Sequence, residues 1–291
     1  MNATERPDPA PRATSLNART GAVLALKPLQ FAKSRVDSVV PAIRRRLAWT
    51  MAVDTLTSVT AVVDHVVVVS DQPALQSTLS GFGVEVEVVA DVRTGGLNPA
   101  LEHGARILQQ HGYETIVAAV GDLPALTPTS LLRIVDAAQP DGRSFVPDAS
   151  GIGTSMLIAS RCDLEPRFQG PSASAHLASG ATALTDDVVG HPISDARRDV
   201  DTEADLLEAY ELGLGRRTAA LMDPEHRRLG VYVPVTVATT GGKHEDGQVI
   251  TADGARLTMS TTVISPPLRA VHPGQRLHAA TASDRVLSAW L

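Results

Sequence analysis

The sequence has a single cysteine, no excess of basic residues, no long apolar run and no glycine-rich nucleotide fingerprint. Cys162, the lone cysteine, excludes an internal disulfide and suits a protein of the reducing cytoplasm. With 26 basic against 32 acidic residues, the net charge of −6 lacks the broad positive field of a duplex nucleic-acid binder. We therefore expect a cytoplasmic protein without a nucleic-acid partner.

Membrane-spanning and secretory segments are also missing from the pattern. The longest apolar runs, such as residues 61–70, are interrupted by Asp64 and His65. They are shorter than the roughly 20 residues that a helix needs to cross a bilayer, so no membrane partner is expected. Residues 1–20 are rich in proline and polar side chains without the apolar centre of a signal peptide, which predicts a disordered N-terminal tail.

From residue 21 onward, short β-branched runs alternate with helical stretches, which predicts an α/β domain around a mostly parallel sheet. Most of the runs are too apolar to have a solvent face. The predicted strands are 22–27, 65–70, 84–90, 115–120, 143–147, 155–160 and 191–195. The predicted helices are 42–58, 99–111, 128–138 and 203–212. Asn98 and Thr127 are expected to cap two of them ahead of a proline, and Thr202 with Asp205 has the spacing of a weak capping box.

After about residue 217 the amino-acid composition changes: valine, threonine and glycine become frequent, with turn pairs such as Gly241-Gly242. We therefore divide the chain into the tail, a larger domain at 21–217 and a small β-rich C-terminal unit of unknown role at 218–291. Residues 247–259 predict a β-hairpin, and residues 270–290 a strand followed by a final turn or helix. A chain ending near Arg217 is expected to fold without this unit.

Carboxylates follow two predicted elements. In "AAVGDLPAL", Asp122 ends a buried run at the strand edge where ligands of parallel α/β sheets gather, although a simple loop cap is an equal alternative. Asp199 and Asp201, two residues apart, project to one side if the chain is extended. Together the three favour an oxygen-rich site suited to Mg²⁺. The alternative is that Asp201 and Asp205 merely favour a helix N-terminus.

A basic loop, "LKPLQFAKSR", follows the first predicted strand. Its Lys27, Lys33 and Arg35 are close enough in sequence to converge on a polyphosphate, although a solvated loop is the commoner outcome. The sequence has neither G-x-x-x-x-G-K-[ST] nor G-x-G-x-x-G, so a phosphate site must rest on side chains.

Small and hydroxyl residues form the last candidate group, in "PDASGIGTSM" and "FQGPSASAH". Gly151 and Gly153 allow close backbone approach to a ligand, and Thr154 offers a hydroxyl. Ser172 precedes a short predicted helix, whose free amides favour an anion. A tight turn, an ordinary helix cap and a structural His176 are the plainer alternatives.

The order of six motifs closely resembles the phosphoenolpyruvate or 2-phospho-L-lactate guanylyltransferase family of coenzyme F420 biosynthesis. They are LKPLQFAKSR, GGLNPAL, GDLPAL, PDASGIGTS, FQGPSASAH and RRDVDTEADL, all between residues 22 and 214. The resemblance implies a three-layer nucleotidyltransferase fold, of the glycosyltransferase A-like kind, at 21–217. It also implies use of GTP and Mg²⁺ to transfer GMP to a small phosphorylated carboxylic acid, with release of pyrophosphate.

The residues that the resemblance assigns fall into four groups. The metal ligands are Asp122, Asp199 and Asp201. The residues that grip the triphosphate are Lys27, Lys33 and Arg35, which together with Asp122 form the catalytic set. The residues near the nucleoside are Gly95, Gly96 and Asn98. The nucleotide-binding set consists of these three and the three basic residues. The residues that bind the acid are Thr154, Gly170 and Ser172.

Phosphoenolpyruvate is the expected acid, giving enolpyruvyl-2-diphospho-5′-guanosine; 2-phospho-L-lactate and 3-phosphoglycerate are the alternatives. The sequence departs from the family pattern at one position that concerns the acid substrate. Gln169 stands where the family has a substrate-contacting glycine, and Gly170 comes one place later. A pterin acceptor would predict a glycine-rich first loop, which is absent. A non-catalytic nucleotide-binding protein of the same fold is the other alternative, although the three aspartates are present. The next enzyme of the pathway is a conceivable recipient of the product, and a homodimer is left open.

Overall fold

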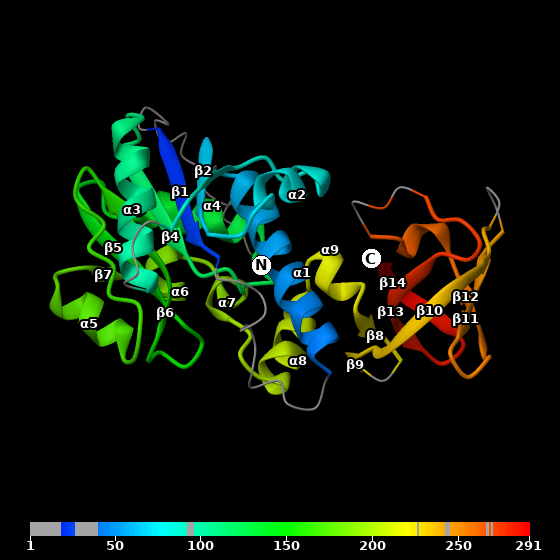
Figure 1. The fold of residues 1–291 in the computed structure, drawn as a ribbon. Coiled ribbons are helices and arrows are strands. Elements are labelled where there is room, and N and C mark those ends of the chain that lie inside the picture. Colours follow the sequence, from blue (N-terminus) through cyan, green and yellow to red (C-terminus); the bar gives the residue numbers. More distant parts are fainter. Residues whose placement is uncertain are drawn as a thin grey trace, which may run out of the picture.

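The computed structural model describes residues 19–26, 40–91, 96–225, 227–241, 245–265, 268 and 270–291. Figure 1 shows two parts: a layered α/β domain, and a small barrel formed by the C-terminal strands. Of the predicted tail, residues 1–18 lie outside the described residues, and Thr20 already begins the first strand. Within the described part, no helix is long and apolar enough to span a membrane.

A seven-stranded sheet forms the centre of the α/β domain, in the order β3-β2-β1-β4-β6-β5-β7. The strands are β1 (Thr20–Ala25), β2 (His65–Val69), β3 (Glu87–Val89), β4 (Thr115–Ala119), β5 (Gly142–Pro147), β6 (Thr154–Ser160) and β7 (Thr182–Ala183). Among these described strands only β6 runs opposite to the others, because it pairs antiparallel with both β4 and β5. The predicted mostly parallel sheet is therefore confirmed.

Alternate residues of each central strand enter different cores, one on each face of the sheet. Leu24 and Val68 belong to the core that α1 and α4 cover, whereas Val23 and Val67 belong to the core under α3. Because both faces of these strands are buried, their sequences are unbroken apolar runs. The described helices are α1 (Pro41–Thr60), α2 (Leu75–Gly81), α3 (Leu97–Gln110), α4 (Pro128–Ala137), α5 (Ser172–Ala178), α6 (Asp186–Val189), α7 (Ser194–Arg197), α8 (Glu203–Leu212) and α9 (Arg216–Ala219).

Two of the three predicted helix caps are confirmed. Thr127 Oγ1 accepts a hydrogen bond from Ser130 N at 3.2 Å, and Thr202 forms a full capping box with Asp205 at the start of α8. The cap predicted at Asn98 is wrong, because α3 begins at Leu97. Gly96 takes the capping position with φ of +94°, a conformation that glycine adopts readily.

The strand predicted at 191–195 is also wrong. Residues 194–197 form α7 instead, and Ile193, just before it, is the buried apolar residue of the segment. One buried side chain is too little to make a strand face, and Pro192 supplies no amide for a sheet ladder. The two-residue strand β7, absent from the prediction, forms that edge of the sheet beside β5.

The C-terminal strands close into a barrel in the order β10-β11-β12-β14-β13. They are β10 (Val231–Thr239), β11 (Gly247–Thr251), β12 (Arg256–Met259), β13 (Arg276–Ala282) and β14 (Arg285–Trp290), with a short 3₁₀ helix, η2 (Thr261–Val263), between β12 and β13. The β-rich prediction and the 247–259 hairpin are confirmed. The final turn or helix is wrong, because β13 and β14 form a second hairpin that turns at Ser283, whose φ is +51°.

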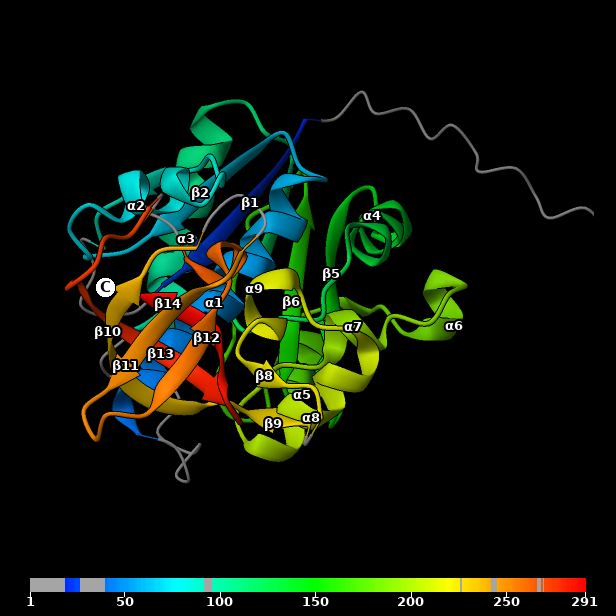
Figure 2. The same ribbon diagram turned by 90° about the vertical axis from the view of Figure 1, so that its right-hand side faces the viewer.

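Helix α1 joins the two parts, and it lies between the sheet and the barrel in Figure 1. Its Ile43, Leu47 and Met51 share a core with Leu221 and with Ala280 of the barrel. Figure 2 presents the barrel side of the molecule, with α1 and α9 beside the barrel strands. A strand pair, β8 (Met222–Asp223) and β9 (Arg228–Leu229), leads into the barrel.

Two charged residues of α1 take part in this junction. The Arg46 guanidinium lies 5.0 Å from the centre of the Trp290 ring in β14, and burial lowers the pKa of Arg46 to about 10. Buried Asp54 accepts hydrogen bonds from Arg217 N at 3.2 Å and Thr218 N at 2.7 Å. The boundary proposed after residue 217 falls inside α9, so we now expect a chain ending there to lose stability.

Replacing Asp54 tests the junction. Asp54→Ala removes the acceptor of two buried backbone amides and leaves the Arg217 guanidinium, 3.6 Å away, without this carboxylate. We expect the free energy of unfolding to fall by about 3 kcal/mol. Chemical denaturation measures this, with Asp136→Ala on the exposed face of α4 as the control. Equal stability of the two variants would contradict the role of Asp54.

Candidate active site

The candidate site lies at the carboxyl ends of β1 and β4. From β1 the chain continues to β2 and β3 on one side of the sheet, and β4 lies on the other side, so the strand order reverses between them. Ligands of open α/β sheets bind at such points. Gly121 follows β4 here, and a Cβ at this position would lie 2.8 Å from Leu26 Cδ2, which explains why a glycine stands before Asp122.

The structure brings the predicted metal ligands together. The Asp122 carbonyl accepts a hydrogen bond from Val200 N at 3.1 Å, which places the 199–201 segment beside the end of β4. Burial raises the pKa of Asp199 to about 6. The negative charges that add to this rise are those of Asp122, Asp148 and Asp201. Four carboxylates therefore lie near one another at this edge.

Asp148, the fourth carboxylate, was missed by the sequence analysis. Arg197 holds its turn in place, because the guanidinium donates to the Pro147 and Asp148 carbonyls, each at 3.1 Å. Gly153 leaves room for the side chain, since a Cβ there would lie 2.4 Å from Asp148 Oδ2. The only signal in the sequence was Pro-Asp ahead of two glycines, which resembles an ordinary turn.

The acidic cluster is loosely arranged. Among the residues that the structure describes, no three of these four carboxylates place an oxygen each within 4.8 Å of one another. Burial is the main cause of the raised pKa of Asp199, and repulsion by the neighbouring carboxylates adds to it; a divalent cation would relieve that repulsion. All the candidate ligands are oxygens, and Mg²⁺ commonly keeps several waters while bound through one or two carboxylates. The donor set thus fits Mg²⁺.

Residues of the "RRDVDTEAD" segment differ in their position relative to α8. Asp205 takes the capping role, because its carboxylate accepts from Thr202 N at 2.8 Å and from Asp201 N at 3.2 Å. Asp199 and Asp201 lie outside the helix and near Asp122. The helix cap therefore orients the chain that carries the predicted metal ligands.

A buried histidine orients Thr154, the first residue of β6. His176 Nε2 accepts a hydrogen bond from Arg167 N at 2.9 Å, and Nδ1 lies 2.9 Å from Thr154 Oγ1. Burial lowers the pKa of His176 to about 4, so the ring is neutral at pH 7. Since Nε2 is the acceptor, the ring proton is on Nδ1 and is donated to Thr154. The Thr154 hydroxyl proton is thereby left to point away from His176.

The two residues that precede the Gly170–Ser172 turn lie beside the start of α3. Asn98 Oδ1 accepts from Phe168 N at 2.8 Å, so the predicted nucleoside residue connects α3 to the predicted acid-binding turn. A Cβ on Gly96 would lie 3.7 Å from Gln169 Nε2, which places the Gln169 side chain beside this predicted nucleotide residue. Ser172 is buried, and its amide donates to the Gly170 carbonyl at 2.8 Å.

Gln169 has φ of +136°, a region that favours glycine. This conformation gives a physical reason for the family's preference for glycine at the position. Four other predicted residues lie outside the described residues: Lys27, Lys33, Arg35 and Gly95. Leu26 is the last described residue before Lys27, and its amide donates to the Val69 carbonyl at the end of β2.

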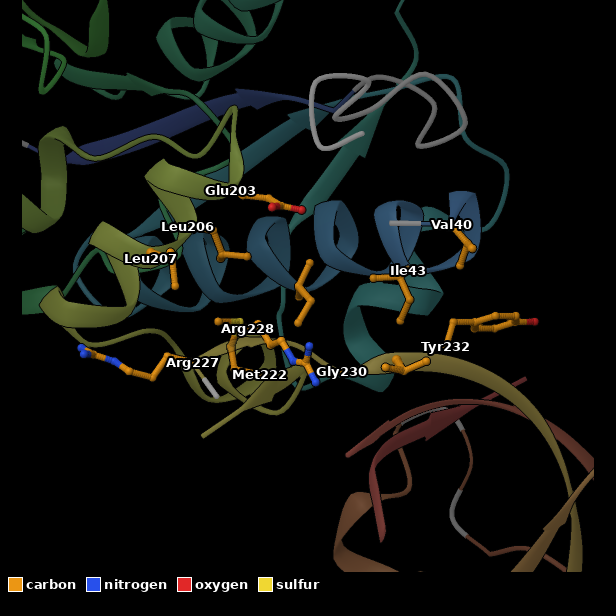
Figure 3. Close-up of a pocket in the computed structure, with 12 residues that line it drawn as sticks. Val40, Ile43, Glu203, Leu206, Leu207, Met222, Arg227, Arg228, Gly230 and Tyr232 are labelled. Atoms are coloured by element: carbon orange, nitrogen blue, oxygen red, sulfur yellow. The ribbon is translucent and has the colours of Figure 1, made fainter. Parts of the chain in front are cut away.

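A separate pocket of about 380 Å³ lies at the junction with the barrel. Figure 3 shows its lining residues from the start of α1, from α8 and from the β8–β10 region. Its walls are largely apolar, with Leu206, Met222 and Tyr232 among them. None of the four clustered aspartates lines it, so we do not place the active site there.

A sequence profile described as "Guanylyl transferase CofC like" matches residues 20–238. The chain belongs to this family. The match includes every motif on which the resemblance was based and ends within β10, so most of the barrel lies beyond it. The predicted family is therefore confirmed.

Two relatives agree with the family, and one solved structure has a similar fold. A "Phosphoenolpyruvate guanylyltransferase" from Salinispora arenicola is 44% identical over 205 residues, covering 68% of this chain and 91% of the relative. A protein of the same name from Streptomyces coelicolor is 43% identical over 204 residues, covering 68% and 93%. A candidate nucleotide-diphospho-sugar transferase from Desulfovibrio desulfuricans G20 superposes with a TM-score of 0.52 at 14% identity, covering 69% of this chain and 93% of that one. This last likeness confirms the nucleotidyltransferase type of fold.

The pH dependence of stability tests the neutral His176. Its pKa is about 4 in the folded protein and about 6.5 ordinarily, so between these values the unfolded chain binds more protons. The contribution of the neutral His176 to the free energy of unfolding is therefore fully present above pH 6.5, and it is lost as the pH falls toward 4. We expect His176→Gln to flatten the fall in unfolding free energy between pH 7 and 4.5 by about 2 kcal/mol. His103→Gln in α3 is the control, and an unchanged slope in His176→Gln would refute the neutral ring.

Gln169 variants test the backbone strain. A side chain at this φ costs about 1–3 kcal/mol, whereas the extra freedom of unfolded glycine costs about 0.5–1 kcal/mol. We therefore expect Gln169→Gly to raise the free energy of unfolding by about 1 kcal/mol. Gln169→Ala keeps the Cβ and should therefore not raise the free energy of unfolding. Comparison of the two variants separates backbone strain from loss of the side-chain amide group. Chemical denaturation decides, and the idea fails if the glycine variant is no more stable than the alanine variant.

Proposed function

We propose that this protein is a GTP-dependent phosphoenolpyruvate guanylyltransferase of coenzyme F420 biosynthesis. The proposal is supported by family membership and by relatives named for this reaction at 43–44% identity. The structural observation that carries it is the cluster of four aspartates, joined through Asp148 and Gly153 to Thr154. A cation-binding edge and a hydroxyl for the acid substrate thus adjoin each other at the switch point of the sheet.

The reaction needs little proton transfer. A phosphate oxygen of phosphoenolpyruvate forms a bond to the α-phosphorus of GTP, and the bond from that phosphorus to the bridging oxygen breaks, releasing pyrophosphate. The nucleophile is already an oxyanion, so the protein must align it and compensate developing charge rather than supply a strong base. This agrees with a site whose only described buried histidine, His176, is occupied by two hydrogen bonds.

Asp122, Asp199 and Asp201 would hold Mg²⁺, and Asp148, whose charge adds to the raised pKa of Asp199, would supply further negative charge for the ion. The bound ion would neutralise charge on the phosphates. We propose that Lys27, Lys33 and Arg35 bind the triphosphate, next to the carboxyl end of β1. Gly95, Gly96 and Asn98 would lie along the nucleoside. Lys27 is two residues beyond the end of β1 in the sequence, and Lys33 and Arg35 come shortly after it; this order along the chain supports the proposal.

The acid would bind on the other side of the cluster, at Thr154, Gly170 and Ser172. With Thr154 accepting from His176, its hydroxyl donates to a carboxylate or phosphate oxygen. The Gln169 amide nitrogen lies beside Gly96 of the proposed nucleoside region, and Gln169 directly precedes Gly170 of the proposed acid region. We further propose a cytoplasmic location, consistent with one unpaired cysteine, and transfer of the product to the next enzyme.

The test is pyrophosphate release from GTP and Mg²⁺ with phosphoenolpyruvate, 2-phospho-L-lactate and 3-phosphoglycerate offered separately. We expect turnover with phosphoenolpyruvate at the highest kcat/KM. Preferred turnover of 2-phospho-L-lactate or 3-phosphoglycerate would keep the chemistry and replace the acid. GTP binding without turnover of any of the three would contradict the proposed function.

Asp122→Asn tests the metal site within the same assay. Loss of one charge from the cluster should lower kcat at least about 100-fold, as is typical when transition-state charge stabilisation is removed. Relief of repulsion on Asp199 should leave stability unchanged or higher, so lost activity cannot be explained by unfolding. Asp136→Asn is the matched control. Full activity of Asp122→Asn would refute its role.

A further inference from the structure

Two histidines and a glutamate converge at the edge of the sheet opposite the candidate active site. His65 is the first residue of β2, Glu87 is the first residue of β3, and His111 caps the C-terminus of α3. His65 Nε2 lies 2.8 Å from Glu87 Oε2, and His111 Nδ1 lies 3.9 Å from the same oxygen. The three ligand atoms all lie within 4.8 Å of one another, as no other group of three does among the described residues.

The topology explains this convergence. β2 and β3 are parallel neighbours with Val67 opposite Glu87, so His65, two residues before Val67, faces the same side of the sheet as Glu87. That side is covered by α3, which returns from the carboxyl edge toward the amino ends of the strands. Its last turn therefore lies above the first residues of β2 and β3, and it brings His111 to the pair.

The imidazole of His65 is held in place by its neighbours. Its ring stacks on Tyr113 with centres 5.8 Å apart and planes 12° apart. Arg19 fixes Tyr113 in turn, because its guanidinium donates to the Tyr113 hydroxyl at 2.9 Å and to the His111 carbonyl at 3.0 Å. One arginine thus connects the supports of both histidines. A ligand set whose rings are oriented before a metal binds is a feature of specific metal sites.

We propose that His65, Glu87 and His111 bind one Zn²⁺ ion. Two imidazole nitrogens and a carboxylate oxygen form a common zinc ligand set, and three protein ligands leave a position open for water. The His65–Glu87 hydrogen bond alone would account for one short contact. It does not account for the second imidazole, whose Nδ1 is directed at the same oxygen.

The surroundings are compatible with a cation. The three side chains are 32%, 36% and 47% exposed for His65, Glu87 and His111, so an ion can enter from solvent. Asp64, next to His65, and Glu85, near Glu87, line an adjacent hollow of about 460 Å³ and add negative charge. The C-terminus of α3 also has the partial negative charge of a helix dipole. Arg19, the positive group here, is directed at Tyr113 and the His111 carbonyl.

This site differs from the acidic cluster in both place and chemistry. The aspartates follow the carboxyl end of β4 and offer only oxygens, which favour Mg²⁺, whereas this trio contains nitrogens, which favour Zn²⁺. The ion would connect β2, β3 and α3 at the amino edge of the sheet. Its binding is therefore measurable without any assay of guanylyl transfer.

The experiment uses the full chain without a histidine tag, with Co²⁺ as the optical probe and Zn²⁺ in competition with a chelating dye. We expect one Co²⁺ per chain with the intense visible absorption of four-coordinate cobalt, and displacement of Co²⁺ by Zn²⁺. His65→Gln, Glu87→Gln and His111→Gln should each weaken Zn²⁺ binding at least tenfold. Zn²⁺ should also raise the melting temperature of the wild type but not that of the His65→Gln/His111→Gln double variant.

Two controls separate this site from others. His103→Gln removes a histidine from the same helix, and Asp122→Asn alters the acidic cluster; both should keep the cobalt spectrum and the zinc affinity. Circular dichroism verifies that each variant is folded, and Glu87→Gln keeps the size of its side chain. The proposal is overturned if the wild type binds Co²⁺ and Zn²⁺ no more tightly than the double variant, or if Asp122→Asn abolishes the spectrum.

Discussion

Burial of both faces of the central sheet is the constraint on which the rest of this structure depends. Alternate valines and leucines of β1 and β2 enter different cores, so helices must cover each face. Polar side chains have no place along such strands and collect where the strands end. One edge of the sheet has the four aspartates, and the other has the two histidines with Glu87. Burial of the sheet therefore explains why both clusters of polar side chains lie at its edges.

Much of the fold was predictable because local signals agreed with tertiary packing. The apolar runs gave the long strands, and the Thr127 and Thr202 caps gave correct helix starts. Predictions were wrong where the structure of a segment depended on a single residue. Asn98 was expected to cap α3, but Gly96 took that position and left the Asn98 oxygen to bond Phe168. The segment around Ile193 has one buried side chain, which sequence periodicity cannot distinguish from a short strand.

The candidate site was predictable as far as motifs specify residue types. Asp122 stood out at the end of a predicted strand, and Asp199 and Asp201 stood out by their spacing of two residues; the structure places the three near one another. Asp148 was not predictable, because its position depends on Arg197 bonding to the backbone of a turn some 50 residues away in sequence. The orientation of the Thr154 hydroxyl was equally hidden, since it depends on which nitrogen of His176 accepts from Arg167. Long-range hydrogen bonds of this kind leave no periodic pattern.

The packing of the barrel against α1 also bears on how the chain folds. Arg46 near the start of α1 stacks on Trp290 near the end of β14, and Ala280 joins the core of Ile43, Leu47 and Met51. During synthesis this face of α1 is therefore completed only after residues 280–290 leave the ribosome. Contacts between such distant segments slow folding, and the part of α1 that the barrel covers stays exposed in the meantime. The barrel thus protects this face of α1 once folded, and it makes that protection one of the later steps of folding.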